Sequence, residues 1–169
     1  MRSSGPKEIL ETFRLHRTLT MDLLKSLGNE QLAWQPIKAS GSFGKQFRHI
    51  LDIQRCYVDS IFTGVLDFKR ADIDHSLESD RDRLLKSLRE EDRRLESGLS
   101  NIPTDELLVH SIDCSRVVKY LRDDNSTASI AKIISWMTEH EIFHEGELAL
   151  YVRSARMKFP GSWIIWGLR

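Results

Sequence analysis

The chain of 169 residues has no excess of charge of either sign, because 25 Lys and Arg residues balance 25 Asp and Glu residues. This balance argues against non-specific binding to nucleic acid or to an anionic membrane surface. The sequence also lacks an apolar run of the about 20 residues that span a membrane, and its first ten residues lack the apolar centre of a secretion signal. Two cysteines, Cys56 and Cys114, are too few for a disulfide framework and fit a reducing cytoplasm.

Helix-breaking residues are scarce as well, with 4 prolines and 9 glycines, whereas charged residues make up 30% of the chain. This composition favours a soluble helical protein over a disordered or an all-β one. The sequence shows neither an internal repeat nor a linker, and its length suits one hydrophobic core. We therefore expect a single domain over residues 1–169.

Apolar residues recur at helical spacing in four segments, which are residues 7–27, 42–63, 76–100 and 126–157. Ser42 is placed to cap the second segment and Gly64 to end it. Between the third and fourth segments, residues 109–113 alternate in the manner of a short strand. The pattern predicts an all-α four-helix bundle with a long crossover between helices 3 and 4.

Two segments outside these helices also carry apolar side chains. Residues 29–41 contain Trp34 and Pro36 and are interpreted as a connector with one short helical turn. The C-terminal tail carries Trp163 and Trp166 after a Pro-Gly pair. Because so much apolar area is unfavourable in water, we expect the tail to dock on the bundle or on a second subunit.

The strongest chemical signal is a pair of histidines on the apolar stripe of the fourth segment. His140 and His144 are one helical turn apart, so both imidazoles leave the helix on the face that points into the bundle. A single buried histidine is usually a core residue with a hydrogen-bond partner. Two adjacent desolvated imidazoles need two sets of partners and repel each other when both are charged. One divalent cation satisfies both, so the pair predicts a metal site.

Residues 140–144 also match the H-E-x-x-H pattern of zinc proteases, in which the glutamate is the general base. Such a protease needs a third ligand, and the carboxylates that follow the motif, Glu145 and Glu147, lie too close on the same helix. The sheet that accompanies the motif is also missing from the pattern. We therefore set proteolysis aside, and keep Glu141 as a candidate general base although it points about 100° away from His140.

The third ligand must come from another helix, and helical periodicity leaves two histidines open. His16 lies on the core stripe of the first segment. His49 lies on a second, semi-apolar strip of the second segment, together with Cys56. His75 and His110 have polar or irregular surroundings and are interpreted as surface residues. Spacing alone does not choose between His16 and His49.

Two motifs and their order along the chain resemble the DinB/YfiT-like superfamily. They are Phe43-Gly44-Lys45-Gln46-Phe47-Arg48-His49-Ile50 near the start of the second helix and His140-x-x-x-His144-x-Gly146 late in the fourth. The likeness covers most of the chain and includes Trp34-x-Pro36 ahead of the second helix. The resemblance implies an up-down-down-up four-helix bundle, often dimeric, with a metal triad that maps onto His49, His140 and His144.

The resemblance also implies a chemistry. Family members hold a divalent metal, and some are thiol-dependent enzymes such as bacillithiol S-transferases and mycothiol-dependent isomerases. Members often carry a basic residue and a glutamine around the glycine after the last histidine, where this chain has Glu145-Gly146-Glu147. This acidic pair is expected to disfavour an anionic substrate or thiol cofactor on that side.

Three further residues are candidates for the surroundings of the triad. Asp52 follows His49 by three positions and is interpreted either as an ordinary surface carboxylate or as a partner that orients the His49 imidazole through a hydrogen bond. Cys56 follows His49 by seven positions on the same side of the helix, and a buried cysteine of this kind is usually a packing residue. His16 is expected to line the pocket even where it is not a ligand.

We therefore expect a cytoplasmic metal-binding protein whose three neutral donors leave coordination positions open to a small-molecule substrate. Three imidazoles suit zinc, nickel, copper or iron and do not distinguish among them, and the resemblance adds manganese. The resemblance favours transfer of a low-molecular-weight thiol, of the bacillithiol type. The alternatives are a metal-dependent hydrolase and a non-catalytic metal-binding or stress-response dimer. Homodimers are expected, whereas nucleic acid and membranes are not expected as partners.

Overall fold

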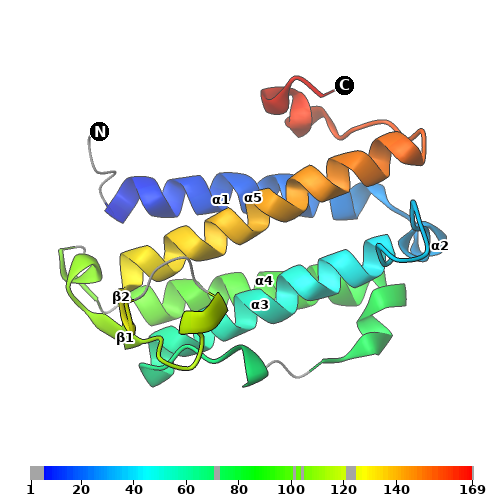
Figure 1. The fold of residues 1–169 in the computed structure, drawn as a ribbon. Helices are drawn as coiled ribbons and strands as arrows, with labels where there is room; N and C mark the ends of the chain where they lie inside the picture. The colour runs from blue at the N-terminus through cyan, green and yellow to red at the C-terminus, as the bar shows by residue number, and fades with distance from the viewer. Residues whose placement is uncertain (1–5, 71–72, 101, 104, 121–124, 169) are drawn as a thin grey trace.

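The computed structural model describes residues 6–70, 73–100, 102–103, 105–120 and 125–168. Its four long helices are α1 (Pro6–Ser26), α3 (Phe43–Thr63), α4 (Arg81–Leu99) and α5 (Ile130–Ser154). Figure 1 shows that α1 and α5 begin at one end of the bundle, whereas α3 and α4 begin at the other. This is the up-down-down-up order, so the predicted four-helix bundle is confirmed.

The helices pack in a ring in which α1 lies against α5, α5 against α3, α3 against α4, and α4 against α1. Their apolar faces form two buried clusters, one toward each end of the bundle. The first contains Leu23, Phe47 and Leu148, and the second contains Val58 and Ile134. Each of the four long helices contributes to both clusters, so the core runs along the length of the bundle. None of the helices in the described part of the chain is both long and apolar enough to cross a membrane.

Short elements fill the connections between the long helices and part of the C-terminal tail. The helical ones are α2 (Asn29–Leu32), η1 (Phe68–Arg70), η2 (His75–Ser79), η3 (Glu106–Leu108), η4 (Val118–Tyr120) and η5 (Gly161–Trp166). The strands β1 (Ser111–Asp113) and β2 (Thr127–Ser129) pair antiparallel, with Ile112 opposite Ala128. The helical turn predicted in the connector after α1 is therefore present, and the strand predicted at residues 109–113 is present over its last three residues, since Val109 instead caps η3.

The ends of α3 agree with the prediction. The Ser42 side chain accepts a hydrogen bond from the backbone N–H of Lys45, which satisfies one of the unpaired donors in the first turn. At the other end, Gly64 takes the left-handed conformation, with φ of 72°, and its N–H bonds to the carbonyl of Ser60. Local chemistry alone therefore sets both ends of the helix that carries His49.

Two helix starts were predicted too early. The third long helix begins at Arg81 rather than at residue 76, because the Asp80 side chain accepts a hydrogen bond from the backbone N–H of Arg83. The fourth begins at Ile130 rather than at residue 126, because Thr127–Ser129 pairs with β1 and Ser129 then caps the helix. Part of the polar run expected before it, residues 123–124, lies outside the described residues.

The C-terminal tail folds back onto the bundle, as expected for its apolar side chains. Trp163 is fully buried, and its indole N–H donates a hydrogen bond to the carbonyl of Leu19 at 3.0 Å. Phe159 stacks on the Trp163 ring with 5.7 Å between the ring centroids. Figure 1 shows η5, in red, above α1 and α5. The tail therefore closes the core along α1.

Gly44 marks the closest approach between α3 and the chain that precedes α4. A Cβ atom at this position would lie 1.8 Å from the backbone carbonyl oxygen of Glu78. A side chain would therefore require a shift of the backbone of η2 rather than the rotation of a flexible group. By contrast, a Cβ atom at Gly146 of α5 would meet no atom within 4 Å.

We predict that substitution by alanine changes the free energy of unfolding in opposite directions at these two glycines. Gly44→Ala should lower the free energy of unfolding by about 1–3 kcal/mol, because the added methyl group overpacks the contact with Glu78. Gly146→Ala should raise it by about 0.5–1 kcal/mol, because alanine favours the helix interior where space allows. Urea denaturation of the two variants and the wild type measures both changes, and equal effects would contradict the close packing of α3 on η2.

Candidate metal centre

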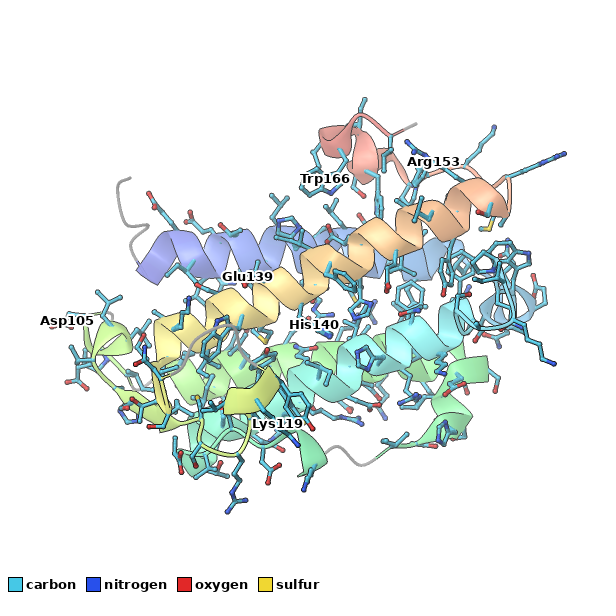
Figure 2. All side chains as sticks on the ribbon, viewed as in Figure 1. Asp105, Lys119, Glu139, His140, Arg153 and Trp166 are labelled. Carbon is cyan, nitrogen blue, oxygen red and sulfur yellow. The ribbon has the colours of Figure 1, made fainter. Side chains whose placement is uncertain are left out.

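Three histidines from two helices meet between α3 and α5. His49 comes from α3, and His140 and His144 come from successive turns of α5. The Nε2 atom of His140 lies 3.3 Å from Nε2 of His49 and 3.2 Å from Nε2 of His144. One candidate ligand atom from each residue lies within 4.8 Å of the other two. Figure 2 shows His140 between the two helices, near the middle of their length.

The separations between these nitrogen atoms fit a shared cation. Nitrogen ligands about 2.0–2.1 Å from a tetrahedral zinc ion lie about 3.3 Å from one another. The measured separations of 3.2 and 3.3 Å agree with this spacing. Nitrogen is also a donor that zinc, nickel and iron share. The residues present therefore fit one divalent ion, and three donors leave further coordination positions to water or substrate.

The histidines are held in the neutral form that binds metals. Burial, together with the neighbouring His144 and His49, lowers the pKa of His140 to about 3. Burial likewise lowers the pKa of His49 to about 4, with His144 and Arg48 acting in the same direction. Burial alone brings the pKa of His144 to about 4. All three imidazoles are therefore uncharged at neutral pH, so few protons compete with a cation for them.

A carboxylate reaches the far side of one of these imidazoles. The Oε2 atom of Glu147 lies 2.8 Å from Nδ1 of His144. The Glu147 side chain is 36% exposed, whereas that of His144 is 7% exposed, so the carboxylate lies at the wet edge of the site. Burial raises the pKa of the Glu147 carboxyl above its ordinary value, and the neighbouring His49 offsets part of this rise. Sequence reasoning missed this contact, although the spacing of three residues is the one that nominated Asp52 beside His49.

Glu141, the candidate general base, faces away from the triad. Its carboxylate is almost fully buried and forms an ion pair with Arg17 of α1, 3.0 Å from Nη2. The same guanidinium contacts Asp92 of α4 at 3.2 Å and the side-chain oxygen of Gln54 of α3 at 2.5 Å. Arg17 therefore links all four helices, and Glu141 is part of that link.

His16 likewise belongs to a cluster on the α1 side of α5. Its Nδ1 atom lies 3.0 Å from Oε2 of Glu145, and the indole N–H of Trp166 donates to the same oxygen at 3.3 Å. Burial, together with Glu141, raises the pKa of Glu145 to about 8. The two members of the acidic pair thus separate, because Glu145 is turned inward and Glu147 lies at the triad. Only Glu147 adds an acidic side chain next to the three histidines.

The remaining two candidates have other roles in the structure. Asp52 is buried and pairs with the guanidinium of Arg48, one turn earlier on α3, rather than with His49. Arg48 extends this contact to Glu78 at 2.7 Å, which ties α3 to η2. Cys56 is buried in the second core cluster, and burial raises the pKa of its thiol to about 11. The thiol is therefore protonated at neutral pH and acts in packing.

Comparison with known proteins agrees with the fold and the motifs. A DinB-like protein from Bacillus subtilis, YjoA, has the same fold, with a TM-score of 0.66 and 22% sequence identity over 89% of this chain and 94% of that one. No curated protein matches the chain. The model of the DinB superfamily matches residues 12–148, a span that includes all three histidines. The chain therefore belongs to the DinB superfamily.

Proposed function

We propose that this protein binds one divalent metal ion through His49, His140 and His144 and uses it in a reaction on a small molecule. The observation that carries the proposal is the convergence of three uncharged imidazoles, in which Nε2 of His140 lies 3.3 Å from Nε2 of His49 and 3.2 Å from Nε2 of His144. A bound divalent ion supplies Lewis acidity, which lowers the pKa of a thiol or water that coordinates it and provides a nucleophile near neutral pH. The chain's own part is to hold three neutral donors in place and to keep further positions free.

The reaction we propose is transfer of a low-molecular-weight thiol to an electrophile. A sulfur–carbon bond forms, the bond between that carbon and its leaving group breaks, and the thiol proton leaves with the leaving group. The buried Cys56 and Cys114 are poor nucleophiles, because burial raises the pKa of each thiol to about 11. The attacking thiol is therefore supplied by a small molecule rather than by the protein.

Two alternatives use the same histidines. In a metal-dependent hydrolase, water takes the place of the thiol. In a non-catalytic protein, the ion serves stability or sensing and the chain acts as a dimer. The exposed apolar side chains of η5, Ile164, Ile165 and Trp166, favour an association of two copies and are compatible with either role.

The first prediction concerns metal content. Purified wild-type protein supplied with zinc or nickel should hold one ion per chain. His144→Ala should weaken binding by at least about 100-fold, more than the loss of a supporting hydrogen bond costs. His110→Ala, at an exposed histidine, is the matched control and should bind as the wild type does. Elemental analysis after equilibrium dialysis measures this, and equal metal content in the wild type and His144→Ala would contradict the site.

The second prediction concerns pH. A histidine binds metal when it is neutral, so affinity is lost as the pH falls through the pKa of the ligands. Because these pKa values lie at about 3–4, the bound metal should be retained from pH 8 down to about pH 5 and released below about pH 4. Dialysis at stepped pH followed by elemental analysis measures the profile. A midpoint near 6.5, the value for an exposed histidine, would show that the triad is not desolvated.

The third prediction concerns activity. A haloalkyl electrophile such as monochlorobimane should be consumed at a rate that requires both a low-molecular-weight thiol and the metal. His49→Ala and chelation should both abolish the rate, and added metal should restore it only in the chelated wild type. Metal-dependent cleavage of an ester without thiol would favour the hydrolase. Stoichiometric metal with neither rate would favour the non-catalytic protein.

A further inference from the structure

The contact between Glu147 and His144 has a direct consequence for the metal centre. A neutral imidazole carries one proton, on either Nδ1 or Nε2, and the other nitrogen offers a lone pair. Oε2 of Glu147 lies 2.8 Å from Nδ1 of His144, and a carboxylate accepts a hydrogen bond from that atom. The proton of His144 is then held on Nδ1, and its Nε2 lone pair faces His140.

We propose that Glu147 is a positioning residue that sets the tautomer and the ring orientation of His144 for metal binding. This inference rests on the proposed function, because it assigns a role in the same site. Without the carboxylate, the proton of His144 is free to move to Nε2, which lies 3.2 Å from Nε2 of His140. A proton there occupies the space in which the three lone pairs converge and must be displaced before a cation binds.

The surroundings of the two side chains support this role. His144 packs edge-on against Phe143, with 5.3 Å between the ring centroids, and against His140 at 4.5 Å. These contacts restrict the ring plane, while the hydrogen bond to Glu147 decides which nitrogen faces inward. Glu147 comes from the same helix, one turn after His144, so the pair needs no other element to form. The carboxylate also increases the basicity of His144 toward a metal.

Three variants test the inference. Glu147→Ala removes the acceptor, whereas Glu147→Gln keeps a side-chain oxygen that can accept the same hydrogen bond. Glu139→Ala changes an exposed glutamate on the same helix and serves as the matched control. Nitrogen-15 NMR of the metal-free protein reports which nitrogen of His144 carries the proton, and Zn²⁺ titration against a chromophoric chelator reports affinity.

Glu147→Ala should move the His144 proton toward Nε2 and weaken Zn²⁺ binding by about 10–100-fold. Glu147→Gln should recover most of this loss, and Glu139→Ala should match the wild type in both measurements. An unchanged tautomer or an unchanged Zn²⁺ affinity in Glu147→Ala would overturn the inference. If the wild type binds no Zn²⁺, the proposed function fails instead, and the spectra of the metal-free protein still decide whether Glu147 sets the tautomer.

Discussion

The ion pair between Arg17 and Glu141 determines how α5 faces the rest of the bundle. Glu141 and Glu145 each follow a histidine, so their side chains leave α5 about 100° around its axis from those of His140 and His144. Both glutamates turn to α1, where Arg17 and His16 meet them at 3.0 Å. Because Glu141 and Glu145 face α1, His140 and His144 face α3. Breaking a buried ion pair costs about 3–5 kcal/mol, so other rotations of α5 are unfavourable.

The same guanidinium also joins α3 and α4 to α5. Arg17 bonds to Gln54 of α3 and Asp92 of α4 as well as to Glu141, and its side chain is 6% exposed. His49 lies five residues before Gln54 on α3, and it meets His140 across the interface that the two buried core clusters line. The helices that carry the three imidazoles, α3 and α5, are thus also joined by the buried contacts of Arg17 with Gln54 and Glu141. In some proteins, buried ionic groups contribute more to a unique arrangement than to net stability, and the contacts of Arg17 with three other helices are of the kind that serve this role.

The fold and the site carry different information about function. A shared fold at 22% identity places YjoA and this chain in one architecture, and architecture alone does not define a reaction. The proposed chemistry depends instead on the candidate donor set, which consists of three imidazoles with pKa values of about 3–4. Glu147 adds a carboxylate at the partly exposed edge of this set, 2.8 Å from Nδ1 of His144.

Much of the fold was predictable from the sequence, because helical periodicity and end caps are local properties. Ser42 and Gly64 bound α3 through contacts within a few residues, and the spacing of His140 and His144 places both on one face of α5 without reference to any other element. Tertiary structure decided what depends on distant partners. Pairing of residues 127–129 with β1 moves the start of α5 to Ile130. Periodicity left His49 and His16 open and the family resemblance favoured His49, but only the relative rotation of α3, α1 and α5 brings His49 to the histidine pair. Periodicity identifies the face of a helix that is buried, but only packing decides which neighbour that face meets.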